Sequence, residues 1–165
     1  MASPEQVFLN PGDFCFAGDG TRIRTLLGSC VSITLWHPRL HIGGMCHYMV
    51  PNRRRQADPH ELDGRYADEA MQLFLRELDR CGTRPQEYEV KMFGGGNQFP
   101  GTPHVAALDI PGDNVAVGLR LLEQYGFHLT SRHLGGQGPR HIVFDLSTGN
   151  VWLKHVNQFV AGDAA

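Results

Sequence analysis

Alternating apolar and polar positions predict β-strands in the first third of the chain. In the segment VSITLW (31–36), aliphatic side chains alternate with Ser32 and Thr34. This period of two is typical of a strand with one buried face, so we expect a half-buried strand. The segment HIGGMCHYMV (41–50) follows a turn that contains Pro38, and it predicts the returning strand of a hairpin.

Further short stretches predict additional strands because each is rich in strand-forming residues and ends at a turn signature. They are residues 6–9, 13–17, 21–28, 88–93 and 127–134, together with a hairpin over 140–156 that turns at STGN.

Two segments have the 3.6-residue periodicity of amphipathic helices. The first is residues 67–80, with an apolar stripe of Met71, Phe74, Leu75 and Leu78. The second runs from about Gly112 to Tyr125, with Val115, Leu119 and Leu122 expected to face inward. Together the elements predict a mixed α/β (α+β) fold, in which a β-sheet core built from hairpins carries two main helices. No linker or charge block divides the chain, so we expect a single domain over residues 1–165.

The two helices belong to a weak internal repeat, called here the internal echo. The order of helix, glycine, strand and glycine loop occurs over residues 67–96 and again over 112–138. This order is common in α/β chains and needs no functional reason. The alternative is that the glycine loops form the rim of a shared site, since glycine lets backbone N–H groups approach a ligand closely.

Composition narrows the classes of function. The chain has 165 residues, a net charge of −2 and 19% charged residues, which disfavours nucleic acid as the main partner. No apolar run is long enough to span a membrane, and the start of the chain does not resemble a secretion signal. Because no secretion signal is recognisable and the four cysteines are widely spaced, we expect reduced thiols in a cytoplasmic protein.

Metal and cofactor motifs are missing from the sequence. His37 and His41 are four residues apart, but Pro38 excludes a metal-binding helix, and we expect both to be exposed turn histidines. Neither C-x-x-C nor H-E-x-x-H occurs, and FGGGNQ lacks the ending of a phosphate-binding loop. We therefore expect no metal and no cofactor.

The predicted hairpin brings a thiol near an imidazole. If Trp36 pairs with His41, Cys30 lies opposite His47 on the same face of the sheet, while Cys46 points to the other face. An imidazole beside a thiol accepts its proton and produces a better nucleophile. From spacing alone, the interpretation of Cys30 as a nucleophile competes with a simpler one, in which Cys30 is a small buried hydrophobic residue.

Other residues near Cys30 fit the same chemistry. Backbone N–H groups around Gly28, Ser29 and Cys30 are candidates for an oxyanion hole, since they lie where a loop becomes a strand. A third group usually orients the base, and the nearby hydroxyls are those of Thr25 and Ser32.

Several segments in fixed order closely resemble the CheD family of chemoreceptor glutamine deamidases. They are NPGDF, TLLGSCVSITLWHPRLHIGGMCHYMVP, GRYADEAM, KMFGGGNQF, LGGQGPRHIVFDLSTG and VWLKHV, which together extend over nearly the whole chain. The resemblance implies Cys30 as the nucleophile, His47 as the base and Thr25 as the third catalytic residue. It also implies an α/β fold similar to that of the cysteine hydrolases.

The same resemblance implies an activity and partners. The expected reaction converts receptor glutamine side chains to glutamate through a thioester, as a protein-glutamine glutaminase that regulates chemotaxis. The implied partners are the cytoplasmic helices of chemoreceptors and a CheC-type phosphatase. Two alternatives stay open: hydrolysis of receptor glutamyl methyl esters, and a mainly regulatory role as the binding partner of that phosphatase.

Overall fold

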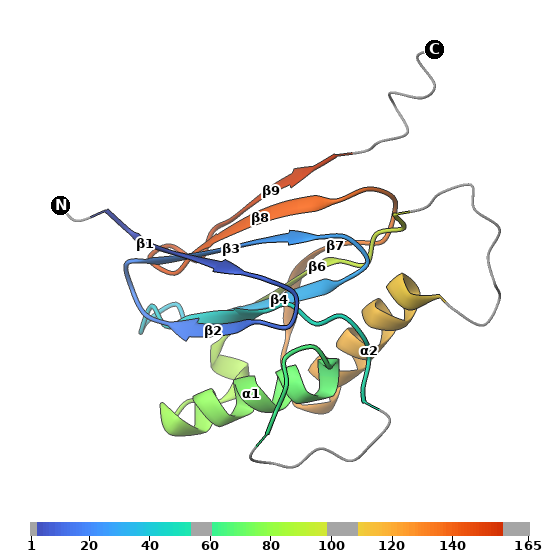
Figure 1. Ribbon diagram of the computed structural model, residues 1–165. Helices are drawn as coiled ribbons and strands as arrows, with labels where there is room; N and C mark the ends of the chain where they lie inside the picture. The colour runs from blue at the N-terminus through green and yellow to red at the C-terminus, as the bar shows by residue number, and fades with distance from the viewer. Residues whose placement is uncertain (1–2, 54–60, 99–108, 157–165) are drawn as a thin grey trace.

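The protein folds into three layers, seen edge-on in Figure 1. The structure is a computed structural model and describes residues 3–53, 61–98 and 109–156. The outer, four-stranded sheet has the order β1 (Glu5–Leu9), β3 (Thr21–Leu27), β8 (Arg140–Asp145) and β9 (Val151–His155). The middle, five-stranded sheet has the order β2 (Phe14–Ala17), β5 (Gly43–Cys46), β4 (Val31–Trp36), β6 (Glu89–Gly94) and β7 (Leu129–Leu134).

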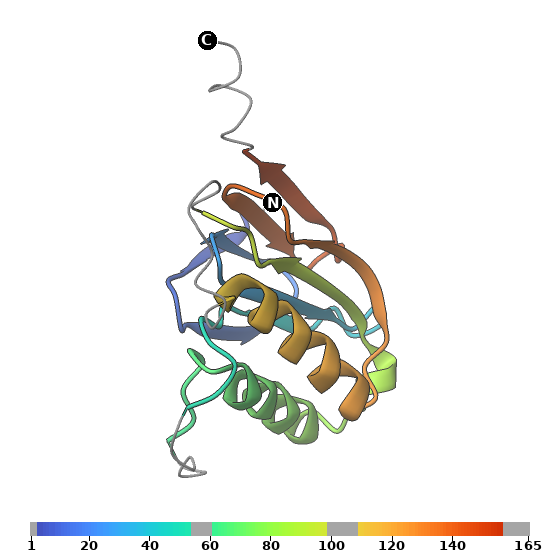
Figure 2. The same cartoon turned by 90° about the vertical axis from the view of Figure 1, so that its right-hand side faces the viewer.

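The third layer is helical. Helices α1 (Ala67–Arg80) and α2 (Ile110–Gln124) lie side by side on the face of the middle sheet that points away from the outer sheet (Figure 2). A 3-10 turn, Pro85–Glu87, leads from α1 into β6. The predicted mixed α/β fold with two main helices is therefore confirmed.

Strand pairing is only partly local. The β4–β5 and β8–β9 pairs are antiparallel hairpins, as the sequence predicts. The other pairs join strands that are distant in the chain, and two of them, β1–β3 and β6–β7, are parallel. Helix α2 forms the crossover between β6 and β7, which is the usual way to connect parallel neighbours.

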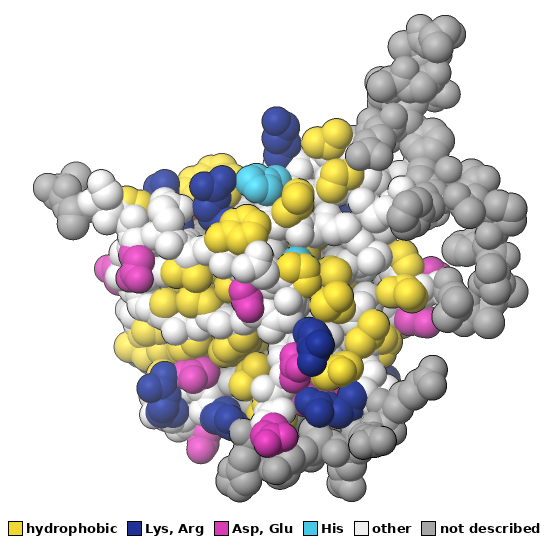
Figure 3. Space-filling model, in the orientation of Figure 1, with side chains coloured by type: hydrophobic (Ala, Val, Ile, Leu, Met, Phe, Trp, Pro, Cys, Tyr) yellow, Lys and Arg dark blue, Asp and Glu magenta, His cyan; other side chains and the backbone are white. Residues whose placement is uncertain are grey.

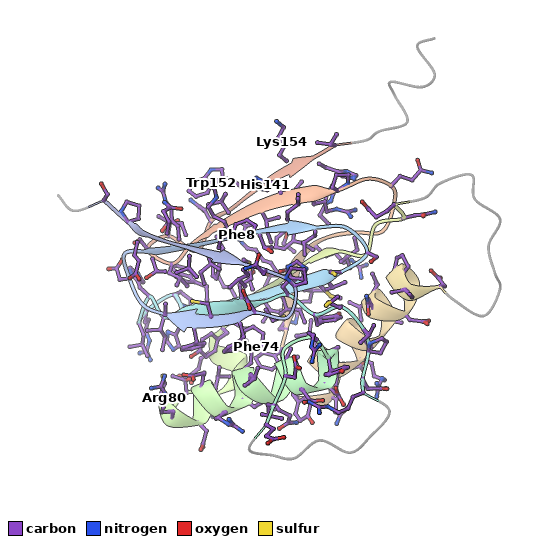
Figure 4. The ribbon with its side chains drawn as sticks, in the orientation of Figure 1. Phe8, Phe74, Arg80, His141, Trp152 and Lys154 are labelled. Carbon is purple, nitrogen blue, oxygen red and sulfur yellow. The ribbon has the colours of Figure 1, made fainter. Side chains whose placement is uncertain are left out.

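Two apolar clusters hold the layers together. One lies between the two sheets and includes Ile23, Leu27, Met45 and Phe144, each at most 1% exposed. The other lies between the middle sheet and the helices, where Figure 4 shows Phe74 of α1 beneath the sheet. Burying each large apolar side chain contributes about 1.5–3 kcal/mol, so both clusters are major sources of stability.

Strand β4 is buried on both faces, so the prediction of a half-buried strand is wrong. Ser32 and Thr34 are at most 1% exposed, like the aliphatic residues between them. The reason is that β4 is the central strand of the middle sheet, which is covered by helices on one side and by a second sheet on the other. The Ser32 hydroxyl is satisfied internally, since it donates to the carbonyl of Cys46.

Helix α2 presents a different face from the one expected. Leu122 is buried as predicted, but Val115 and Leu119 are only partly buried. The buried face instead consists of Asn114, Val117, Gly118, Leu121 and Leu122. The sequence pattern did not predict this face because the buried stripe includes a polar residue, Asn114, and a glycine, Gly118.

His37 is also placed differently from the prediction. It is only 2% exposed, whereas His41 is partly exposed. The His37 Nδ1 accepts hydrogen bonds from the backbone N–H groups of Arg39 (3.3 Å) and Leu40 (3.1 Å). The imidazole is therefore buried because it satisfies the backbone of the β4–β5 turn.

The outer face of the four-stranded sheet is open to solvent in the described part of the chain. Phe8 and Trp152 are 53% and 49% exposed, and they lie in one cross-strand row with Arg24 and Val143. Figure 4 shows Phe8, Trp152 and His141 along this face, and Figure 3 shows apolar and basic side chains mixed above it. Among the described helices, none is long and apolar enough to cross a membrane.

Candidate active site

Three glycine-containing loops meet at one edge of the two sheets. The Gly96 N–H donates to the Gly28 carbonyl (3.0 Å), and the Gly135 N–H donates to the Gly94 carbonyl (2.9 Å). The Asn97 N–H donates to the Gly136 carbonyl (2.9 Å). Because β6 and β7 are parallel, the loops that follow them emerge at the same edge. The loops of the internal echo therefore lie together, directly beside the segment that leads to Cys30.

Gly94 lets β6 approach the Cys30 backbone closely. Its φ of 115° is a conformation that residues with a side chain rarely adopt. A Cβ atom at this position would overlap the Cys30 carbonyl oxygen, whose partner is the Gly95 N–H at 2.9 Å. The glycine thus fixes the backbone of Cys30 against the end of β6.

The register of the β4–β5 hairpin differs from the predicted one. Trp36 pairs with Gly43, not with His41, and further along Val31 bridges to Tyr48. The predicted register is therefore wrong by two residues, because the connecting loop includes Ile42, whose carbonyl accepts from the N–H of the residue after Trp36.

A shift of two residues preserves the faces of a strand, whereas a shift of one would exchange them. Continued past Val31, the observed register sets Cys30 opposite Met49, with His47 at the diagonal position of the same face. Cys30 packs against the apolar cluster between the two sheets. The thiol and the imidazole therefore belong to the same layer of the protein.

Thr25 joins His47 across the two sheets. Its Oγ1 donates a hydrogen bond to the Leu9 carbonyl (2.8 Å) and lies 2.6 Å from His47 Nδ1. A hydroxyl has one proton, which here goes to Leu9, so Thr25 Oγ1 accepts from the Nδ1–H of the imidazole. The neutral imidazole then carries its proton on Nδ1 and an unprotonated lone pair on Nε2. This tautomer is the one that a base acting through Nε2 requires.

The imidazole of His47 is neutral over most of the pH range. The side chain is buried, with 1% of its surface exposed, and burial lowers its pKa to about 4. The carboxylate of Asp13 acts in the opposite direction, since a nearby negative charge favours the imidazolium. At neutral pH, His47 is therefore able to accept a proton.

Cys30 is partly buried, and burial raises the pKa of its thiol. Two hydrogen-bond donors near the sulfur, the Cys30 backbone N–H and the Ser29 hydroxyl, lower this pKa in part. The two shifts favour a neutral thiol at Cys30 and a neutral imidazole at His47. Burial therefore disfavours a preformed thiolate at Cys30.

The other cysteines have different surroundings. Cys46 is fully buried in the cluster between the middle sheet and the helices, so it faces away from Cys30 as predicted, and burial raises its pKa to about 12. Cys15 is partly buried, and burial raises its pKa as well. Cys81 is exposed at the end of α1. Among the four thiols, Cys30 is the one that combines partial exposure with neighbouring donors and the layer of His47.

The sequence patterns did not identify two residues of the candidate active site, Asp13 and Asn114. Asp13 lies close enough to His47 to influence its pKa, although it follows a turn and resembles a turn residue. Asn114 is completely buried on α2, and its Nδ2 donates to the carbonyls of Ser29 (3.2 Å) and Met49 (2.8 Å). A polar residue on the apolar stripe of α2 was the signal that would have found it.

The buried Arg140 supports the glycine loops from beneath. It is 1% exposed, its Nε donates to His133 Nδ1 (2.8 Å), and its Nη2 donates to the Gly135 carbonyl. Burial lowers the pKa of the guanidinium and of His133. Over the described ranges, no three His, Cys, Asp or Glu side chains are arranged as a metal site.

The fold is therefore that of an α/β protein in which a histidine–threonine pair and a partly buried thiol lie in the layer between two stacked sheets. Comparison with known proteins gives the family. The family model described as CheD chemotactic sensory transduction matches residues 49–155. The chain belongs to the CheD family.

Curated relatives agree with this assignment. The chain is 50% identical over 151 residues to the probable chemoreceptor glutamine deamidase CheD of Pseudomonas fluorescens, covering 91% of this chain and 84% of that protein. It is 53% identical over 148 residues to CheD 3 of Dechloromonas aromatica, covering 90% and 86%. A more distant relative, CheD 1 of Leptospira interrogans, is 37% identical over 156 residues, covering 90% and 91%.

Proposed function

We propose that this protein deamidates glutamine side chains of chemoreceptors to glutamate, with Cys30 as nucleophile, His47 as general base and acid, and Thr25 as the residue that orients His47. The names of the relatives support the substrate class. The observation that carries the chemistry is the hydrogen-bond chain from His47 Nδ1 through Thr25 Oγ1 to the Leu9 carbonyl, which leaves Nε2 as the free base.

The first half of the reaction forms a thioester. His47 Nε2 accepts the Cys30 thiol proton as the sulfur attacks the carboxamide carbon of the glutamine side chain. The carbonyl oxygen becomes an oxyanion, and donors of the segment 28–30 stabilise it. The His47 imidazolium gives its proton to the amino nitrogen as the C–N bond breaks, and ammonia leaves.

The second half returns the enzyme to its starting state. His47 Nε2 accepts a proton from water as the water oxygen attacks the thioester carbon. The C–S bond breaks, the thiolate of Cys30 regains a proton from the imidazolium, and the carboxylic acid of the new glutamate is released and loses its proton to ammonia in solution. Each turnover consumes one water, releases one ammonium ion and adds one negative charge to the receptor. Electrostatic repulsion between packed receptor helices is the physical basis for a change in signalling.

The roles of Gly28 and Ser29 follow from the same proposal. The Ser29 hydroxyl and the Cys30 N–H lie near the sulfur, which supports donors on this side of the reacting carbon. The Gly28 carbonyl accepts from the Gly96 N–H, which holds the loop in place, and the Gly28 N–H stays a candidate oxyanion donor. A cytoplasmic location fits the substrate, because the glutamines lie on cytoplasmic receptor helices. Association with a CheC-type phosphatase stays a prediction of the family resemblance.

The test is incubation of the purified protein with a glutamine-bearing receptor fragment. We expect free ammonia and the mass gain of an amide-to-acid conversion at mapped glutamines. Cys30→Ala removes the nucleophile and should abolish both signals, while Cys15→Ala is the matched control and should retain them. Equal activity of wild type and Cys30→Ala contradicts the proposal.

A second substrate separates the two forms of acyl chemistry. A fragment that carries glutamyl methyl esters releases methanol if the same thioester forms from an ester. Methanol release with no ammonia release contradicts deamidation and favours the esterase alternative.

A further inference from the structure

Asn114 connects the segments that carry Cys30 and His47. It lies in the N-terminal half of α2 and is 0% exposed. Its Nδ2 uses both protons, one on the Ser29 carbonyl (3.2 Å) and one on the Met49 carbonyl (2.8 Å). Ser29 directly precedes Cys30, and Met49 follows His47 by two residues. A single side chain from a third element thus bridges the backbones of the two candidate catalytic segments.

The ladder between these segments is short where the bridge occurs. Strand β5 ends at Cys46, so His47 lies outside the regular strand. Beyond it, Val31 and Tyr48 exchange one pair of backbone hydrogen bonds, at 3.1 and 3.0 Å. Cys30 precedes β4, and its carbonyl accepts from the Gly95 N–H and not from the segment of His47. Among the described hydrogen bonds, the backbone pair of Val31 and Tyr48 joins the two segments directly, and Asn114 joins them through its side chain.

The orientation of the Asn114 amide is fixed by its partners. Rotating the amide by 180° would direct Oδ1 at two carbonyl oxygens, which is repulsive. In the observed orientation Oδ1 is buried without a hydrogen-bond partner among the described residues. An unpartnered buried acceptor is unfavourable, so the stabilising contribution of this amide lies in its two Nδ2 bonds.

Helix α2 is held close enough for Asn114 to reach the sheet. The Tyr48 hydroxyl donates to the backbone carbonyl of Asn114 at 2.5 Å. One turn later, Gly118 gives the room that this hydroxyl needs, since a Cβ atom there would overlap Tyr48 Oη and Met92. These contacts of Tyr48, which follows β5, hold the N-terminal half of α2 against the sheet.

We propose that Asn114 is a positioning residue for the Cys30–His47 pair. It holds the nucleophile and the base at their working separation by binding the backbones beside them, and it does not touch the substrate. The inference rests on the proposed function, because it assigns Asn114 to that same pair.

The test measures Cys30 reactivity and catalysis in parallel. The tryptic peptide 25–39 contains Cys30 and no other cysteine, so its alkylation by iodoacetamide is followed by mass spectrometry. We expect Asn114→Ala to slow alkylation and lower kcat by roughly tenfold to a hundredfold, with KM little changed, because a small displacement of a base has effects of this size. Val117→Ala, a buried truncation on the same helix face, should change neither rate.

The coupling with His47 distinguishes positioning from general loosening. If Asn114 acts through the base, Asn114→Ala should have no further effect on alkylation in a His47→Ala background. Equal slowing in both backgrounds, or no slowing in either, overturns the positioning role. Because alkylation needs no receptor, this result is independent of whether the protein deamidates. His47→Ala that leaves alkylation unchanged overturns the Cys30–His47 pair and the positioning role together.

A second variant keeps the test valid if Asn114→Ala does not fold. Asn114→Asp keeps the volume but directs a carboxylate at the two carbonyls, and circular dichroism monitors folding of both variants. If either variant folds, its rate of Cys30 alkylation and its kcat test the positioning role. If both are unfolded at 25 °C, Asn114 is a structural residue of α2 and the positioning role is overturned.

Discussion

Replacing Thr25 by Val removes one oxygen atom from the centre of the proposed site. Valine has nearly the same shape as threonine, so the packing between the two sheets is kept. Two buried groups lose their partner: the carbonyl of Leu9, which is 2% exposed, and the Nδ1–H of His47, which is 1% exposed. Each unsatisfied buried group costs about 1–3 kcal/mol, so Thr25→Val should lower the free energy of unfolding by roughly 2–6 kcal/mol.

The variant has one way to relieve this cost, and it destroys the base. If the imidazole moves its proton from Nδ1 to Nε2, the orphaned donor disappears from the interior. Nε2, the proposed base, then carries a proton and has no lone pair to accept one. With either tautomer, kcat for deamidation should fall, by roughly tenfold to ten-thousandfold if general base catalysis is lost. Thr25→Ser retains the hydroxyl and should keep kcat within a few-fold of wild type.

Urea unfolding at pH 7 gives the change in stability, and ammonia release from a receptor fragment gives kcat. A stable Thr25→Val protein with wild-type kcat would refute the assignment of Thr25 as the partner that orients the base. Equal loss of kcat in Thr25→Val and Thr25→Ser would show that the position matters through packing and not through its oxygen.

Three further predictions follow from the same site. Because burial lowers the folded-state pKa of His47 to about 4, below its ordinary value of about 6.5, the stability tied to its neutral form is present above pH 6.5 and lost as the pH falls toward 4. Urea unfolding should show about 2 kcal/mol more loss between pH 7 and pH 5 in wild type than in His47→Gln, and equal losses would contradict the burial of a neutral imidazole. Asp13→Asn removes a charge that favours the imidazolium, so kcat should fall by about threefold at low salt, and an unchanged kcat would mean that this charge has no role in catalysis. Cys46→Ala should lower stability by about 1 kcal/mol but leave kcat within twofold, since Cys46 lies on the opposite face of β5; loss of activity in a folded variant would reverse the assignment of the two thiols.

Local patterns in the sequence predicted the elements well. The apolar stripe of residues 67–80 predicts α1 with the bounds that the structure has. Both hairpins also occur where the turn residues indicate them. These features depend on neighbours within a few residues, which is the range over which periodicity and turn chemistry act.

Features that depend on distant parts of the chain were not predictable in this way. Burial of Ser32 results from a second sheet that lies over β4, and no pattern within β4 signals that cover. The contact of Thr25 with His47 arises because β3, which carries Thr25, joins the outer sheet, while His47 directly follows β5 of the middle sheet. Asn114 follows His47 by 67 residues in the chain and reaches the site from α2. There it occupies a helix face that periodicity assigns to apolar side chains.

The measurement that bears most directly on the mechanism is detection of the thioester itself. The protein is mixed with a receptor fragment, quenched in acid during the first turnover, and digested with trypsin, which separates Cys30 from Cys46. We expect the receptor peptide, less one ammonia, to be attached to peptide 25–39 through Cys30, and to disappear on treatment with hydroxylamine. An adduct on Cys15, Cys46 or Cys81, or ammonia release from a protein whose Cys30 stays unmodified throughout the turnover, would contradict the assignment of Cys30 as the nucleophile.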